Sequence, residues 1–214
     1  MARKTLQTKS EAELASYQVK QIGNTCSFHA IGVAIKLLLN QEIDPAALSD
    51  KVNQLWWRGR IMRVAPDWAV TPRMQVRIVR YLAKENNLPI TAFYTHGTIE
   101  SLQAVLSDPN TIGLITLIWL WGKAPPIYRG DTTHNYNSTA KMGGHTMILA
   151  AYDPDHLADD QFSTPWGFIN PWLANSKQLF WMRDDDFRKS WRFPLPLVGP
   201  NPLVLIQKTV KPLS

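Results

Sequence analysis

Cysteine is almost absent from this chain, because Cys26 is the only one among 214 residues. A single thiol excludes a disulfide bond within the chain and any metal site that is built from several cysteines. It also gives no sign of an oxidising compartment, in which small domains depend on disulfides. The disulfide-rich and zinc-finger classes of protein are therefore excluded.

Long hydrophobic runs are missing as well. The longest apolar run, residues 112–121, is too short to cross a bilayer and suits a buried strand. The first residues include basic side chains but no apolar stretch typical of a secretory signal. We therefore expect no membrane partner. We expect either a cytoplasmic protein or one that a secretion system delivers into a target cell without a cleaved signal peptide.

Charge of either sign is sparse. Charged residues make up 19% of the chain, and the formal net charge is a moderate +6. The basic side chains within residues 73–84 are spaced to share one side of a helix, either as a solvated face or as a contact face for an acidic partner. No segment interleaves basic and aromatic residues in the manner of RNA-binding modules, so we expect no nucleic-acid partner.

Apolar residues, by contrast, make up 45% of the chain, which is enough for one sizeable core. Their periodicity and the capping residues predict helices first and strands afterwards, an order typical of an α+β fold with helices packed against an antiparallel sheet. The first helix should end at Asn40. The predicted helices cover residues 27–40, 44–57, 71–87 and 98–108, with a short one at the end of 179–191. The predicted strands cover residues 112–121, 145–153, 166–172 and 202–210.

The domain organisation follows from this order of elements. Residues 1–20 are expected to form a polar arm, and residues 21–214 a single domain. Within that domain we expect a helical lobe over about residues 21–110 and a sheet lobe over about 111–214. Loops as long as 122–144 in compact domains are usually functional or mobile, so this loop is our candidate for substrate selection.

Cys26 is the first candidate for chemistry. It follows a Gly-Asn-Thr turn and stands where the first long helix begins. Unpaired backbone N–H groups and the helix dipole favour a thiolate at such a position. The alternative is an inert cysteine that packs as a small apolar side chain.

A thiol nucleophile needs a base, and the base needs an orienting group. His145 is the best candidate among the five histidines, because it follows Gly-Gly and opens an apolar strand. Asn170 ends the next predicted strand, so antiparallel pairing would bring it beside His145. Asp153 is the alternative orienting residue, although an Asp-Pro pair favours a turn.

An oxyanion formed during thiol attack needs hydrogen-bond donors. The backbone N–H of Cys26 is one candidate, and the side-chain amide of Gln21 is the second, with Gln18 as its alternative. Trp172 is expected to shield the hydrogen bond between the base and its orienting group from water.

Several other residues complete the set of expectations. Gly143, Gly144 and His134 are expected to contact substrate. His29, one turn past the cysteine, should point into the scaffold. The acidic run 184–186 should begin a helix rather than bind a metal, and we expect neither a metal nor a cofactor.

Taken together, these motifs resemble the papain-like cysteine peptidase superfamily. The resemblance covers residues 18–39, with Gln21 and Cys26, and residues 140–191, with "GGHTMILAAYDPD", "GFINPW" and "DDDFRKSW". It is most similar to the bacterial branch, which includes bacteriocin-processing peptidases and the cysteine-protease effectors of plant pathogens. Residues 45–110 match nothing in the family.

The resemblance implies a two-lobed α+β fold, in which a helical lobe carries the cysteine helix and an antiparallel sheet lobe carries the histidine and the asparagine. It implies hydrolysis of a protein or peptide substrate by Cys26, His145 and Asn170, starting from an imidazolium–thiolate pair. It further implies an effector or antibacterial toxin, with a cognate inhibitor or immunity protein as partner.

Two departures from the bacterial branch keep other functions open. Ser27 follows the thiol where that branch usually has glycine or tryptophan. "GNTC" and the spacing from Gln21 to Cys26 are similar to deubiquitinating peptidases, and "CSFH" to the Josephin group among them. The same triad also serves transglutaminases and deamidases. A catalytically inactive peptide-binding module is the alternative outside the enzymes.

Overall fold

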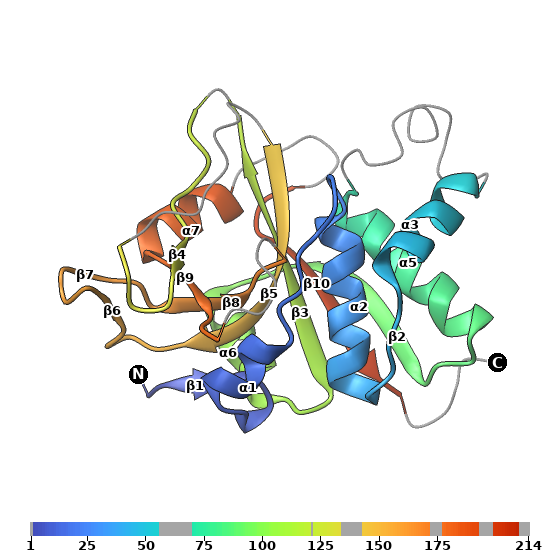
Figure 1. Ribbon diagram of the computed structural model, residues 1–214, viewed down its shortest axis with the longest axis horizontal. Helices are drawn as coiled ribbons and strands as arrows, with labels where there is room; N and C mark the ends of the chain where they lie inside the picture. The colour runs from blue at the N-terminus through green and yellow to red at the C-terminus, as the bar shows by residue number, and fades with distance from the viewer. Residues whose placement is uncertain are drawn as a thin grey trace.

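The computed structural model describes residues 2–55, 70–120, 122–133, 143–171, 177–192 and 199–209, which form a mixed α+β fold (Figure 1). The helices are η1 (Leu6–Thr8, a 3-10 turn), α1 (Glu11–Ser16), α2 (Cys26–Leu39), α3 (Pro45–Gln54), α5 (Pro72–Glu85), α6 (Ile99–Ser107) and α7 (Asp184–Trp191). The strands are β1 (Lys4–Thr5), β2 (Ile90–His96), β3 (Thr111–Trp119), β4 (Tyr128–Arg129), β5 (Gly143–Tyr152), β6 (Leu157–Ala158), β7 (Phe162–Ser163), β8 (Trp166–Ile169), β9 (Phe180–Met182) and β10 (Pro202–Lys208).

Local sequence signals set the helix ends. Asp44 and Thr71 cap α3 and α5 by accepting from backbone N–H groups of the first turn, and a proline follows each cap. Thr98 forms a reciprocal capping box with Ser101 at the start of α6. Asn40 ends α2, as predicted, and it adopts the left-handed conformation.

One eight-stranded sheet organises the molecule. Its order is β2-β10-β3-β5-β8-β9-β4, with β1 paired to β5, and every strand pair within the described residues is antiparallel. The first half of β5 pairs with β3, from Trp119↔Gly143 to Leu114↔Ile148. Its second half pairs with β8 and β1. Strand β5 therefore joins the two halves of the sheet.

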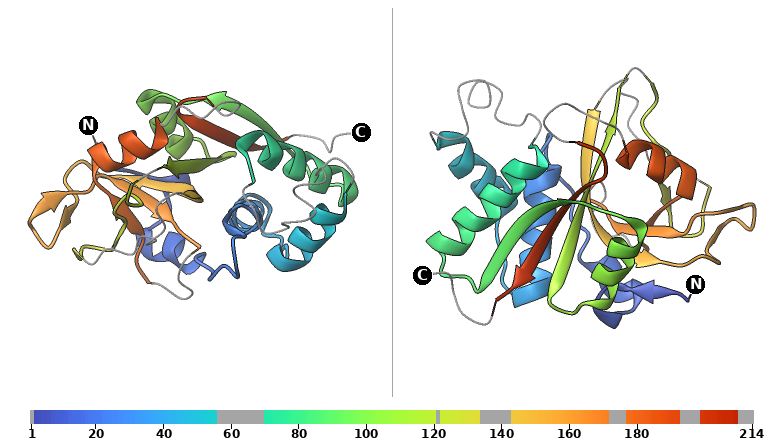
Figure 2. Two further views of the ribbon diagram at one scale, coloured as in Figure 1. Left: turned by 90° about the horizontal axis from the view of Figure 1, so that it is seen from above. Right: turned by 180° about the vertical axis from the view of Figure 1, so that it is seen from behind.

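Helices cover both faces of this sheet. Seen from above, α2 and α3 lie on one side, whereas α6 and α7 lie on the other (Figure 2). Helix α2 contacts β3, β5 and β10, and α6 contacts β3 and β5. The start of α2 consequently lies against the central strand rather than at the periphery of the fold.

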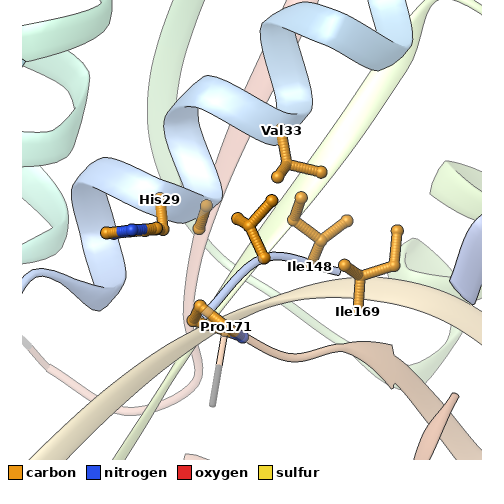
Figure 3. A pocket seen from close by; sticks show the side chains of 7 residues that line it. His29, Val33, Ile148, Ile169 and Pro171 are labelled. Atoms are coloured by element: carbon orange, nitrogen blue, oxygen red, sulfur yellow. The ribbon is translucent and has the colours of Figure 1, made fainter. Parts of the chain in front are cut away.

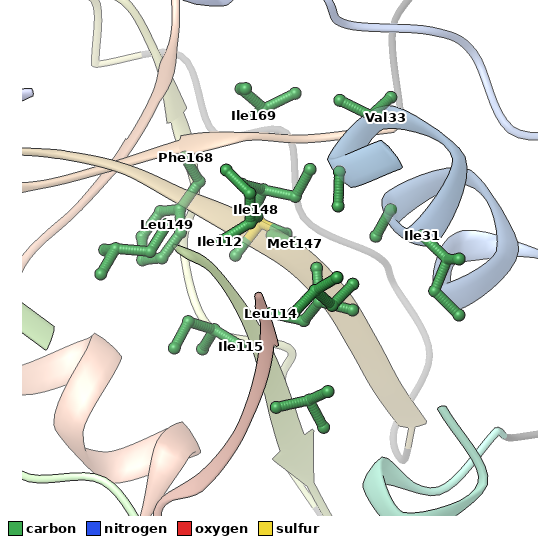
Figure 4. Packing of buried hydrophobic residues seen from close by; sticks show 14 of the residues in the cluster. Ile31, Val33, Ile112, Leu114, Ile115, Met147, Ile148, Leu149, Phe168 and Ile169 are labelled. Atoms are coloured by element: carbon green, nitrogen blue, oxygen red, sulfur yellow. The ribbon is translucent and has the colours of Figure 1, made fainter. Parts of the chain in front are cut away.

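The core follows the alternation of side chains along β5. Ile148 and Ile169 point toward Val33 of α2, while Leu149 and Phe168 lie on the opposite face (Figure 4). All five side chains are buried. Both faces of the central strands are thus filled, which explains why the predicted strands read as continuous apolar runs.

Two expectations about chain organisation need correction. Residues 1–20 are not simply a polar arm: β1 pairs with β5, and Leu6 and Leu14 are fully buried in the core. The expected helical lobe also contributes β2, which pairs with β10 along its whole length. Both strands become recognisable only through partners far away in the sequence. No helix among the described residues is long and apolar enough to cross a membrane.

Candidate active site

Cys26 is the first residue of α2, and its thiol lies against β5. The residue is partly exposed, and the next residue, Ser27, is hydrogen-bonded through its hydroxyl to that of Thr146 in β5 at 3.0 Å. The start of α2 therefore lies beside the start of β5, where Thr146 follows His145.

The environment of the Cys26 thiol does not favour its ionised form. Burial raises the pKa of Cys26 above its ordinary value, and the hydrogen bonds from Thr146 and Ser27 oppose that shift without cancelling it. The expected thiolate at a helix N-terminus is therefore not the resting form, because loss of solvation outweighs the donors at this helix start.

His145 and Asn170 are brought together as their spacing predicted. Ring atom Nε2 of His145 donates to Oδ1 of Asn170 at 2.8 Å, and the exposed fractions of the two residues are 3% and 0%. An amide oxygen only accepts, so this bond places the proton on Nε2. In the neutral ring, Nδ1 then carries the lone pair and is the basic atom.

Burial also determines the charge of the base. It lowers the pKa of His145 to about 4, and the hydrogen bond to Asn170 opposes the shift only in part. Together with the raised pKa of Cys26, this corrects the expected imidazolium–thiolate pair. The resting site holds a thiol and a neutral imidazole at neutral pH.

The two glutamines have different positions. Gln18 is buried, donates from Nε2 to the carbonyl of Gln178 at 2.7 Å, and accepts at Oε1 from the backbone N–H of Asn170 at 3.2 Å. It therefore holds the strand end that carries Asn170. Gln21 donates from Nε2 to the carbonyl of Gly23 at 2.8 Å, within the turn before the cysteine. The amide nitrogen has a second N–H that this bond does not use.

The turn itself is tied to the end of β8. The backbone N–H of Gln21 donates to the carbonyl of Pro171 at 2.6 Å, and the Thr25 hydroxyl donates to the carbonyl of Ile22 at 2.5 Å. The segment before the thiol and the segment after Asn170 are thus joined directly. Ile22, at the tip of this turn, is 75% exposed, so the surface beside the site is open to a partner.

A buried polar cluster beside the start of α2 was not predicted from the sequence. Nε2 of Gln75 lies 3.1 Å from the hydroxyl of Ser27, 3.2 Å from that of Thr116 and 3.0 Å from that of Thr146. Each of the four residues is buried. The cluster joins α2, α5, β3 and β5.

The remaining candidates take up structural positions. Nδ1 of His29 lies 3.1 Å from the carbonyl of Thr25, inside the scaffold as expected. Asp153 follows the far end of β5 and accepts from the backbone N–H of Asp155, so it does not orient His145. His134 and Trp172 lie outside the described residues.

The two glycines before the histidine differ in their surroundings. A side chain at Gly143 would meet the ring of Trp119 at 2.6 Å, whereas one at Gly144 would meet only the carbonyl of Leu117 at 3.5 Å. Packing accounts for a glycine at 143. Gly144 is exposed and has room beside it, so it is the better of the two candidates for substrate contact.

A small cavity lies behind the site, between α2 and the strands β5 and β8 (Figure 3). Its volume is about 10 Å³, which leaves room for one water molecule at most. Neither Cys26 nor His145 lines it. The lining residues are Val19, His29, Ala30, Val33, Ile148, Ile169 and Pro171. This cavity is a gap in packing and not a substrate pocket.

No family model matches this chain, and no curated protein matches it. Nor does the described part of the chain contain a group of three or more His, Cys, Asp or Glu side chains that could hold a metal ion.

Proposed function

We propose that this protein is a cysteine peptidase that uses Cys26 as nucleophile, His145 as base and Asn170 as orienting residue. The observation that carries the proposal is the buried His145–Asn170 hydrogen bond on the strand whose next residue, Thr146, is hydrogen-bonded to Ser27, the neighbour of Cys26. A nucleophile, a base and an orienting group in this relation are the minimum for acyl transfer.

The first step starts from the neutral pair. As the sulfur attacks a peptide carbonyl, the thiol proton passes to Nδ1 of His145, and the resulting imidazolium donates from Nε2 to Asn170. The tetrahedral oxyanion accepts a hydrogen bond from the backbone N–H of Cys26, because this N–H has no partner within its own helix. The second donor is the Gln21 N–H that does not bind Gly23.

The second half of the reaction reverses these proton movements. The imidazolium gives its proton to the leaving amine, and the C–N bond breaks to leave an acyl–enzyme on Cys26. A water molecule then loses a proton to His145 as it attacks the thioester. The acid product leaves, and the proton returns to the sulfur.

The same proposal extends to the papain-like arrangement of two lobes. The helices α2, α3 and α5 would form one lobe, and the sheet portion with β5, β8 and α7 the other. A bacterial effector or toxin setting, with an inhibitor or immunity protein as partner, rests on the sequence resemblance alone.

The test compares newly formed protein N-termini in cells that express the wild type or Cys26→Ala. We expect termini that appear only with the wild type. New N-termini that appear equally with both proteins would exclude the peptidase function. A glutamine-to-glutamate change or a new isopeptide bond without chain cleavage would instead assign the site to a deamidase or transglutaminase, and a ubiquitin-based thiol probe reports an isopeptidase.

A further inference from the structure

Gln18 is a buried polar residue in the segment between α1 and the cysteine turn. The residue is 2% exposed. The carbonyl of Ala15 accepts from its backbone N–H at 3.1 Å and from its Nε2 at 3.4 Å, which ties Gln18 to the end of α1. Burial of an amide is unfavourable unless the amide makes hydrogen bonds. The other partners of this amide therefore indicate what the residue does.

The two ends of the Gln18 amide bind backbone groups from two different parts of the sheet. Oε1 accepts from the N–H of Asn170 at 3.2 Å, and Nε2 donates to the carbonyl of Gln178 at 2.7 Å. Asn170 directly follows β8, and Gln178 lies two residues before β9. The amide therefore lies between the end of one strand and the approach to the next.

The register of β8 and β9 shows how these two backbone groups would otherwise pair. The strands are antiparallel and pair up to Phe168↔Phe180, so Asn170 would stand opposite Gln178 two residues further along. Carbonyl groups alternate in direction along a strand, and that of Leu179 accepts from the residue after β4, on the other side of β9. The carbonyl of Gln178 therefore points toward β8. In a continued ladder, the N–H of Asn170 would donate to it directly.

The Gln18 amide takes the position of this hydrogen bond in the ladder. A side-chain amide offers an acceptor and a donor in one plane, as a peptide unit does. Two hydrogen bonds in series span a wider gap than a single one, so the amide holds the end of β8 apart from the approach to β9. The next residue is fixed as well, because the carbonyl of Pro171 accepts from the backbone N–H of Gln21 at 2.6 Å.

This separation matters because the side chain of Asn170 orients the base. Oδ1 accepts from Nε2 of His145 at 2.8 Å, and this bond places the proton of the neutral ring on Nε2. Strand β8 lies between β5 and β9 in the sheet. A shift of Asn170 toward β9 is therefore a shift away from β5 and from the imidazole.

We propose that Gln18 is a positioning residue, whose amide replaces one hydrogen bond between β8 and β9 and so keeps Asn170 within reach of His145. The inference rests on the proposed peptidase function, in which the base needs one fixed tautomer. It also gives α1 a part in the site, since the end of this helix holds Gln18.

The test observes the tautomer of His145 by ¹⁵N NMR of the full chain with labelled histidine at pH 7. The ring is neutral at that pH because its pKa is about 4, and His145→Gln identifies its signals. Gln18→Met keeps the length of the side chain and removes both the donor and the acceptor. Asn170 can then bond Gln178 directly, and the separation between the two ring ¹⁵N shifts should roughly halve as the tautomers mix.

A matched control separates this effect from a general loss of packing. Gln207→Met makes the same change in β10, where the amide donates to Thr111 at 3.0 Å, and should leave the shifts of His145 unchanged. Unchanged shifts in Gln18→Met, folded by circular dichroism, would overturn the proposal. If that variant does not fold, hydrogen exchange of the wild type decides. The amide of Asn170 should exchange slowly, and exchange at the rate of an unprotected amide would overturn the proposal.

This readout needs no substrate, so the two proposals fail separately. Mixed tautomers in Gln18→Met, without Cys26-dependent N-termini in cells, would retain the positioning role and exclude the peptidase function. Cys26-dependent N-termini together with an unchanged tautomer would retain the peptidase function and remove Gln18 from its mechanism.

Discussion

The two faces of the central sheet are packed with different kinds of side chain. The face under α2 is filled mainly by small and branched aliphatic residues such as Ala30, Val33 and Ala34. On the face under α7, Phe187 stacks on Trp191 at a centroid distance of 5.2 Å and lies 5.0 Å from Trp166.

The difference matches what each face contributes to the site. Small side chains let α2 approach β5 closely enough for the Ser27 hydroxyl to lie 3.0 Å from that of Thr146. Large rings bury much area with few rotatable bonds, which suits the support of a short strand. Strand β8, with Trp166 and Phe168, ends one residue before Asn170. The thiol thus depends on close approach, and the imidazole on a rigid strand end.

Truncation of one core side chain on each face should have the largest effect, and it tests whether the two faces unfold together. Phe187→Ala should lower the free energy of unfolding by about 3 to 5 kcal/mol, and Ile31→Ala by about 2 to 5 kcal/mol. Because β5 is shared by both faces, each variant should unfold in one transition. Urea unfolding followed by tryptophan fluorescence and by far-UV circular dichroism checks this, and two separate midpoints would show that the faces are independent units.

Acid should weaken the fold through His145. Its folded pKa of about 4 lies below the ordinary value of 6.5, so the unfolded chain binds a proton between these values that the folded chain does not. The stabilisation is complete above pH 6.5 and is lost as pH falls to 4, by about 3 kcal/mol. The substitution His145→Gln should remove this pH-dependent part of the free energy of unfolding.

The measurement is urea unfolding of the wild type and His145→Gln at several pH values from 7 to 4. His29 and His156 also have pKa values lowered by burial, and they titrate in both proteins. The difference between the two curves therefore isolates His145. If the free energies of unfolding of the two proteins change equally with pH, the imidazole of His145 is exposed to water in solution.

Asn170→Ala tests the rigid strand end at the site itself. Loss of the Oδ1 acceptor frees the tautomer of His145, and we expect a decrease of roughly tenfold to a hundredfold in cleavage rate, less than removal of the base. The ¹⁵N shifts of the imidazole should show mixed tautomers. Asn170→Asp keeps an acceptor, should keep the tautomer fixed, and should raise the pKa of His145. A fixed tautomer in Asn170→Ala would exclude the orienting role.

Substitutions of the two glycines before His145 should have the smallest effects on stability. Gly143→Ala forces the Trp119 ring to move, which should cost about 1 to 3 kcal/mol of stability. Gly144→Ala meets an ordinary contact distance and should leave stability nearly unchanged. Thermal unfolding checks both variants. Equal loss from the two would mean that the start of β5 tolerates neither side chain.

The candidate site was predictable only in part. Cys26, His145 and Asn170 were identified because a helix start, a strand start and a strand end are local signals. Gln75 could have been found as a polar residue in an apolar helical stripe, but its hydroxyl partners on β3 and β5 could not. The neutral resting state was also missed, since a helix start predicts a lowered thiol pKa, whereas burial by distant segments raises it.

The sequence by itself determined the elements whose causes are local: the caps at Asp44, Thr71 and Thr98, the stop at Asn40, and the apolar periodicity of the helices and long strands. Only the tertiary structure decided the placement of β1 and β2, the polar cluster beside the start of α2 and the charge state of the site. Caps and periodicity act over a few residues along the chain. Desolvation and hydrogen bonding between elements depend on which distant segments exclude water from a group, and that is set only when the chain has folded.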